Sequence, residues 1–310
     1  MLSNIKSPDK KKISSSTVVV VSFLVDFLDI VLSLAVAIIS GSVIMVSQVL
    51  EGMADLISSG LLLVGLARSS QKEDKDHPFG YGRELYFWAL LSGMVMFAIS
   101  SILSIYFGWQ RFRHPQEVHD INLAFAVLVL TAITNGASFF LSLKRLLRNR
   151  NINQVIKIFL RTSLIETKTT FILDLMGMSA SILGAIALII YKFTNDYRFD
   201  GLGAILIGTT LGILAFILLM GVMDLIVGRS ASSEVEGRIR LITLNTPEVR
   251  KILDLKTLHI GSEKLLVNME VNLAEDLKTH EIENLIHKIK EEIKKEVPEV
   301  KHIQVELENF

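Results

Sequence analysis

The sequence predicts a membrane α-helical protein in which six transmembrane helices precede a small α+β domain. Three observations support this fold class. Half of the 310 residues are hydrophobic and only 21% are charged, a balance that few soluble domains show. Six apolar stretches are long enough to cross a bilayer, and beyond residue 228 the pattern becomes that of a soluble domain. The lipid bilayer is therefore an expected partner.

Each apolar stretch has about 20 or more residues, the length that a transmembrane helix needs. The stretches lie near 17–40, 42–67, 85–109, 121–144, 164–192 and 199–227. Only Ser40, Gly41 and Ser42 separate the first two, which predicts a tight helical hairpin. The predicted organisation is a cytoplasmic tail over 1–16, a transmembrane domain over 17–228 and a cytoplasmic domain over 229–310.

Positive charge is unequal on the two sides of the predicted membrane domain. Only Arg111, Arg113, Lys192 and Arg198 fall on one side. The other side carries Lys6, Lys10, Lys11, Lys12, Arg68, Lys72, Lys75, Arg83, Lys144, Arg145, Arg148, Arg150, Lys157 and Arg161. An excess of Lys and Arg marks the cytoplasmic side, so both termini are predicted to be cytoplasmic. The first apolar stretch is long and lacks a small-residue cleavage pattern, which favours an anchor helix over a signal peptide. Together with the short loops, this favours a prokaryotic plasma membrane.

The C-terminal region reads as two helices and three strands. A helical signal begins at Ser233, apolar residues at helical spacing mark a second helix over 279–296, and β-type segments lie at 253–260, 265–273 and 302–307. The resulting order, α-β-β-α-β, predicts a small ferredoxin-like sandwich.

Composition excludes several kinds of function. There are no cysteines, so disulfides, zinc-thiolate sites and thiol nucleophiles are absent. The formal net charge is zero, which argues against nucleic acid as a partner. The spans contain no His cluster, no Ser/His/Asp set and no glycine-rich phosphate loop, so the chain is not expected to be an enzyme.

Three carboxylates in the spans are the strongest functional candidates, because a charge in the membrane interior is costly. Glu51 and Asp55 lie four residues apart, on one face of a helix, and Asp174 lies on the fifth span. No Lys or Arg lies in the middle of any span, which weakens the alternative of a structural ion pair. Small residues around them are expected to let the two helices approach closely: Gly52, Ala54, Ser58, Ser59, Gly60, Gly177, Ser179, Ala180, Ser181 and Gly184.

Four further polar residues lie in the spans. Asp26 and Asp29 fall near the start of the first span, where a water-filled vestibule would solvate them. Asn135 and Asp224 are expected to make polar contacts between helices.

The stretches GSVIMVSQVLEGMAD, DKDHPFGYGRELYFWAL and VMDLIVGRSASSEV closely resemble the cation diffusion facilitators. The resemblance covers nearly the whole chain. It implies a six-helix homodimer that exchanges zinc or a related divalent ion for protons, with a cytoplasmic ferredoxin-like domain completing the dimer. The transported metal and protons would then be the only cofactors.

The family's transport site would fall on Glu51 and Asp55 of the second span and on Asp174 of the fifth. The expected partner of Asp174 falls on Thr170, which is a weak ligand, so Met178 or Asp200 remain alternatives. The resemblance also implies a second metal site at Asp74 and His77. There, however, Tyr81 replaces the third His.

The identity of the metal depends on the ligand types. All seven histidines fall in loops or in the C-terminal region, so the membrane site offers only oxygen and thioether ligands. Such a site suits manganese or iron(II) somewhat better than zinc. A zinc exporter of the same family is the first alternative, and a non-transporting scaffold or sensor subunit with a degenerate site is the second.

The C-terminal domain offers a weaker candidate for a regulatory metal site. His259, His302, Glu306 and Glu308 fall on or near its strands. The simpler interpretation is that these side chains are solvated on a charged surface.

Overall fold

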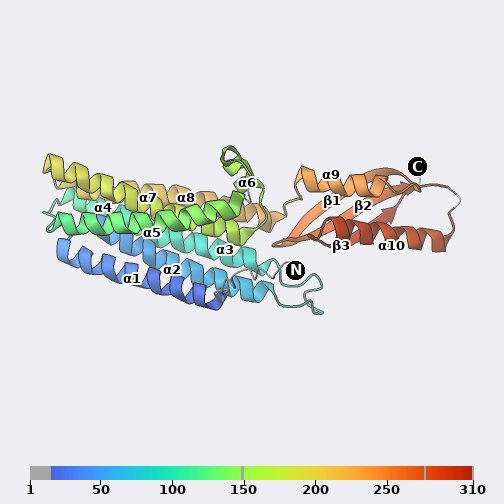
Figure 1. Cartoon of the computed structure of the whole chain (residues 1–310), viewed down its shortest axis with the longest axis horizontal. Helices are drawn as coiled ribbons and strands as arrows, with labels where there is room; N and C mark the ends of the chain where they lie inside the picture. The colour runs from blue at the N-terminus through green and yellow to red at the C-terminus, as the bar shows by residue number, and fades with distance from the viewer. Residues whose placement is uncertain (1–14, 148–149, 276, 309–310) are drawn as a thin grey trace, which may run out of the picture.

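The computed structural model describes residues 15–147, 150–275 and 277–308, so most of the predicted N-terminal tail lies outside the described residues. A bundle of long helices lies beside a smaller α+β domain, and the chain passes from one to the other after α8 (Figure 1). The helices of the bundle are α1 (Ser15–Ser40), α2 (Val43–Ser69), α3 (Glu84–Val95), the π-helical η1 (Met96–Ile102), α4 (Leu103–Arg113), α5 (Ile121–Leu147), the 3-10 turn η2 (Ile152–Gln154), α6 (Val155–Arg161), α7 (Ile165–Thr194) and α8 (Arg198–Val227).

Five helical segments of the described chain are long and apolar enough to cross a membrane. They are α2, the continuous run α3–η1–α4, α5, α7 and α8, and they coincide with five of the predicted stretches. The remaining predicted stretch, 17–40, falls on the 26-residue helix α1. Many large apolar side chains on these helices are exposed, Phe140 and Ile213 among them, as expected for surfaces that face lipid. The protein is therefore an integral membrane protein.

The predicted hairpin between the first two spans is confirmed. Helix α1 ends at Ser40 and α2 begins at Val43, with Gly41 at a φ of +63° between them. Such a positive φ strains residues with a Cβ, so glycine suits this turn. The Ser42 hydroxyl caps α2 by accepting a hydrogen bond from the backbone N–H of Met45.

Glycines bring α4 and α8 into direct backbone contact. A methyl group at Gly201 would lie 2.6 Å from the Phe112 nitrogen and 2.7 Å from the Gly108 oxygen, and one at Gly208 would lie 2.8 Å from the Ser101 oxygen.

The prediction about small residues concerns the second and fifth spans, which they are expected to bring close together. Gly177 and Gly184 of α7 do face α2, because methyl groups there would lie 3.1 Å from Glu51 Oε1 and 2.9 Å from Ile44 Cγ2. The prediction is wrong for Gly60, where a methyl group would meet nothing within 4 Å.

The C-terminal domain has the predicted α-β-β-α-β order. It consists of α9 (Ser233–Leu244), β1 (Val249–Gly261), β2 (Lys264–Leu273), α10 (Thr279–Glu296) and β3 (Val300–Leu307). Strand β2 is central, antiparallel to β1 and parallel to β3. Alternate residues of β2 are buried, and they pack with α9 and α10 in one apolar core that includes Val267, Met269 and Ile289.

The turn between β1 and β2 contacts the membrane domain closely. A methyl group at Gly82, just before α3, would lie 2.6 Å from the Ile260 carbonyl oxygen, and one at Gly261 would lie 2.9 Å from the Gly82 Cα. Beside this contact, the Ser262 hydroxyl lies 2.8 Å and 3.1 Å from the two carboxylate oxygens of Glu166, in the first turn of α7. The two domains therefore meet at the start of α7, the helix that carries Asp174.

Candidate metal transport site

Five carboxylates on three helices of the bundle lie close enough for their charges to interact. They are Asp26 and Asp29 on α1, Glu51 and Asp55 on α2, and Asp174 on α7. The charge of Asp26 acts on each of the other four, and that of Asp174 acts on both residues of α2. Among the described residues, none of the five forms an ion pair with a Lys or Arg. When ionised, the group therefore carries a negative charge that no Lys or Arg of the described residues neutralises through an ion pair. We refer to these five residues as the carboxylate cluster.

The predicted carboxylates differ in their exposure. Glu51 is buried, with 6% of its surface exposed, whereas Asp55 and Asp174 are partly buried. Within the described ranges, no three His, Cys, Asp or Glu side chains converge closely enough to hold one metal ion. The structure thus brings the predicted carboxylates into one region without placing them at ligand distances from a single point.

Polar groups of three helices surround Glu51. A methyl group at Gly177 would lie 3.1 Å from Glu51 Oε1 and 2.9 Å from Asn135 Nδ2, so these two side chains flank the same face of α7. The Asn135 amide donates to Ser181 Oγ (3.4 Å), and the Ser181 hydroxyl donates to Gln48 Oε1 (3.2 Å). Asn135 therefore joins α5 to α7 as expected, and it also lies beside the candidate site.

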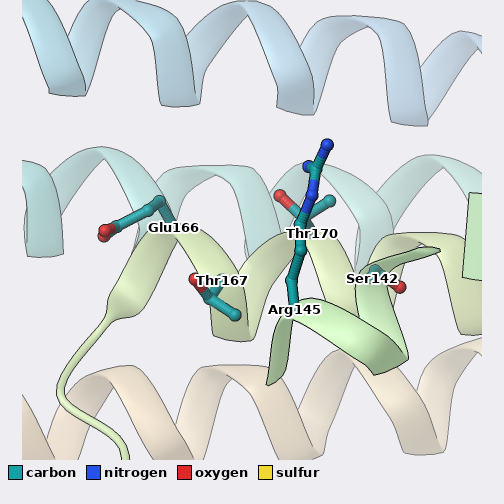
Figure 2. Close-up of a pocket in the computed structure, with 5 residues that line it drawn as sticks. All are labelled: Ser142, Arg145, Glu166, Thr167 and Thr170. Carbon is teal, nitrogen blue, oxygen red and sulfur yellow. The ribbon is translucent and has the colours of Figure 1, made fainter. Parts of the chain in front are cut away.

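A small cavity lies one helical turn from Asp174, at the end of the bundle that faces the C-terminal domain. Its volume is about 100 Å³, and its lining residues are Ser142, Arg145, Glu166, Thr167 and Thr170. Figure 2 shows Ser142 and Arg145 of α5 beside the two threonines of α7. Ser142 also lies close to the Asp174 carboxylate. The cavity therefore lies next to Asp174, although Asp174 does not itself line it.

The weaker candidate ligands near Asp174 have separate positions. Thr170 lines this cavity one helical turn before Asp174, and Met178 lies one turn after Asp174, partly buried. Asp200 lies at the opposite end of the bundle, hydrogen-bonded to the start of α2, so it is not a partner of Asp174. Asp224 at the end of α8 pairs with Arg229 at 3.0 Å instead of joining two membrane helices.

The loop between α2 and α3 is held by hydrogen bonds among its own residues. The Asp74 carboxylate accepts hydrogen bonds from the Tyr81 hydroxyl (2.6 Å) and from the backbone N–H groups of His77 (2.7 Å) and Asp76 (3.0 Å). The Tyr81 hydrogen bond is the main reason that the pKa of Asp74 lies below its usual value. These contacts fit a structural turn, and the second metal site at Asp74 and His77 stays a prediction.

The residues expected at a regulatory site are dispersed. His259 is buried in β1, whereas Glu306 and Glu308 are exposed at the end of β3 and beyond it. His302 Nε2 lies 3.7 Å from Glu73 Oε1 in the α2–α3 loop, and the His302 ring packs edge-on against the ring of Phe79. His302 therefore contacts the α2–α3 loop of the membrane domain and, among the described residues, does not form a metal site with the other three.

Burial of His259 predicts a pH-dependent stability of the folded chain. Burial and the neighbouring Arg229 charge lower the pKa of His259 to about 4, and its Nδ1 has no hydrogen-bond partner among the described residues. The unfolded chain takes up this proton near pH 6.5, so the stabilisation is present above that pH and is lost as the pH falls toward 4. We expect the advantage of the wild type over His259→Gln to shrink by about 1–3 kcal/mol across this window.

Thermal unfolding of the full-length protein at a series of pH values measures this change. His280→Gln, which alters an exposed histidine on α10, is the matched control for the loss of a histidine side chain. A difference between His259→Gln and the wild type that stays constant with pH would contradict the prediction.

Comparison with known families finds two matches in succession. The cation efflux transmembrane domain matches residues 19–227, and the cation efflux protein cytoplasmic domain matches residues 231–310.

Among curated proteins, the human "Proton-coupled zinc antiporter SLC30A9, mitochondrial" is 25% identical over 94% of this chain. The chain spans 58% of the length of that relative. The "Cation-efflux pump FieF" of Shewanella oneidensis is 24% identical over 79% of this chain and 78% of its own length. The "Zinc transporter ZitB" of Pectobacterium atrosepticum is 24% identical over 98% of this chain and 85% of its own length.

Proposed function

This chain belongs to the cation efflux family, and on that premise we propose that it moves a divalent metal cation out of the cytoplasm in exchange for protons. The observation that carries the proposal is the carboxylate cluster, with Glu51 buried in the bundle. Its negative charge, when the carboxylates are ionised, is costly in a low-dielectric environment unless cations neutralise it. A divalent metal ion provides that neutralisation, and so do protons bound to the carboxylates.

Exchange follows from this requirement. Glu51, Asp55 and Asp174 bind the metal as carboxylates, and its release leaves negative charges that protons then neutralise. Because metal and protons stabilise the same group of charges, each displaces the other. Movement of the helices relative to one another exposes the cluster alternately to the two sides of the membrane.

The ligand types favour manganese or iron(II). Besides the carboxylates, Gln48, Asn135 and Ser181 place amide and hydroxyl groups beside Glu51, whereas no membrane helix contains a histidine. Oxygen ligands suit manganese and iron(II) better than they suit zinc. Two of the relatives are named for zinc, so a zinc exporter is the alternative within the family.

The proposal extends to the arrangement in the membrane. Six helices cross the bilayer if α1 spans it together with the other five segments, and both termini then lie on the cytoplasmic side with the excess of Lys and Arg. The cavity at Thr170 lies at the end of the bundle next to the C-terminal domain, and we propose that the metal enters the membrane domain from this cytoplasmic end. We also propose that the α+β domain is ferredoxin-like and holds two copies together as a homodimer in a prokaryotic plasma membrane.

Transport by purified protein in liposomes tests the function. Manganese, iron(II), zinc, cobalt and cadmium are supplied separately, and metal uptake is recorded together with the internal pH. We expect metal to enter as protons leave, with manganese and iron(II) faster than zinc. Metal uptake without proton flux would exclude the exchange, whereas the absence of uptake for every metal would favour a scaffold or sensor subunit.

A further inference from the structure

A buried charged group lies at the end of the bundle remote from the C-terminal domain. Asp200, in the first turn of α8, has no exposed surface. Its carboxylate accepts hydrogen bonds from the Ser42 hydroxyl (2.6 Å) and from the backbone N–H groups of Val43 (2.9 Å) and Ile44 (3.2 Å). These groups are the N-cap and first turn of α2, so α8 provides part of the cap of α2.

Arg111 extends this contact to a third helix. Its Nε lies 3.5 Å from Asp200 Oδ2, and its side chain is almost fully buried. The guanidinium also donates hydrogen bonds to the carbonyl oxygen of Gly41, in the α1–α2 turn, and to that of Gln116 (3.3 Å) beyond α4. Asp200 and Arg111 together therefore connect α4 and α8 to the α1–α2 hairpin.

This contact lies on one side of the carboxylate cluster, and the cavity lies on the other. Glu51 follows Ser42 by nine residues along α2, roughly 14 Å of helix. The cavity shown in Figure 2 lies toward the opposite end of the bundle, where Thr170 is one helical turn from Asp174. The structure thus has a small cavity at the end next to the C-terminal domain and buried, paired charges at the remote end.

We propose that Asp200 and Arg111 form the gate at the remote end of the bundle, and that their contacts with the α1–α2 hairpin must separate before the cluster opens to that side. Separation would leave a buried carboxylate and a buried guanidinium unpaired, which is costly until water solvates them. The pairing of the two charges therefore stabilises the conformation in which the remote end is closed. Asp200 acts through α2, the helix that carries Glu51 and Asp55, and is thus a positioning residue. The role in transport rests on the proposed function, whereas the gate can be tested without measuring transport.

Cysteine labelling is suited to this test because the chain contains no cysteine. Ser181→Cys places one thiol beside Gln48, about one helical turn from Glu51 toward the remote end. A thiol reagent that cannot cross the bilayer is added to the side of the proteoliposomes that exposes the remote end of the bundle. Thr194→Cys lies at the exposed end of α7, so its labelling measures the fraction of molecules whose remote end faces the reagent. Ser142→Cys, in the cavity, reports access from the opposite face.

A gate predicts opposite changes on the two faces, because opening one end lowers the population that is open at the other. With Asp200→Asn we expect labelling of Ser181→Cys from the remote face to rise by about ten-fold or more, and labelling of Ser142→Cys from the opposite face to fall. Ser42→Ala, which removes one hydrogen bond and keeps both charges, should cause a smaller change in the same directions. Asp196→Asn, at an exposed acidic residue of the same end, should cause none.

Two results would overturn the gate. Faster labelling at both thiols would mean that Asp200 only stabilises the fold. Unchanged labelling in Asp200→Asn and Ser42→Ala would mean that these contacts do not limit opening. Neither result bears on whether the protein exchanges metal for protons, because no transported ion is measured.

Discussion

Replacing Asp55 with asparagine is expected to lower the initial rate of metal transport by about 100-fold or more while leaving the protein folded. The substitution keeps the size of the side chain and removes one negative charge from the carboxylate cluster. Asp174→Asn should have a similar effect, because Asp174 is the acidic residue that α7 contributes to the cluster. Asp26→Asn and Asp29→Asn should have smaller effects, since both residues lie on α1, outside the pair on α2.

Metal uptake into liposomes that contain equal amounts of each purified variant measures these effects. Asp224→Asn is the matched control, because Asp224 is an acidic residue of a membrane helix that pairs with Arg229 outside the cluster. The control should transport metal at nearly the wild-type rate. Retained transport in both Asp55→Asn and Asp174→Asn would exclude the proposed site.

Replacing Gly201 with valine is expected to destabilise the membrane domain by about 3 kcal/mol. Already the Cβ would lie 2.6 Å from the Phe112 nitrogen and 3.0 Å from the Phe112 Cα. These are backbone atoms of the end of α4, so they cannot move aside as a flexible side chain can. The helices α4 and α8 would have to separate and lose their close packing.

Thermal unfolding in detergent, monitored by circular dichroism, tests this expectation. Gly60→Val is the matched control, because it places the same side chain in a membrane helix where a Cβ meets nothing within 4 Å. The control should unfold within about 1 kcal/mol of the wild type. Equal unfolding temperatures for the two variants would show that the contact between α4 and α8 does not limit stability.

Hydropathy was a reliable guide to the membrane helices. Five predicted stretches coincide with helices of spanning length, because a bilayer requires a long apolar run whatever the surrounding sequence. The hydropathy pattern did not predict the π-helical segment Met96–Ile102, which lies where Gly208 and Gly212 of α8 contact Ser101. That local change of helix type arises at a contact between helices distant in sequence.

The candidate site was predicted in part. Glu51, Asp55 and Asp174 stood out because charged residues are rare in apolar spans. Asp26 and Asp29 are predicted to be solvated, and Asp26 is indeed exposed. Nothing in the sequence indicated that the charges of both residues act on Glu51. Gln48 was missed, because a neutral amide gives no strong signal in a sequence. Its hydrogen bond with Ser181 spans 133 positions of the chain.

The sequence by itself determined the membrane location, the order of the elements and the candidates for charge in the bilayer. These follow from local composition and spacing, which act through hydrophobicity and helix geometry. Only the tertiary structure decided which polar groups meet. It placed Asp200 at the cap of α2 instead of beside Asp174, and it brought α1 into the carboxylate cluster. The physical reason is that helix packing fixes the position of each side chain along the bundle and the direction in which it points. Contacts between helices, such as that between Gly201 and Phe112, set this packing.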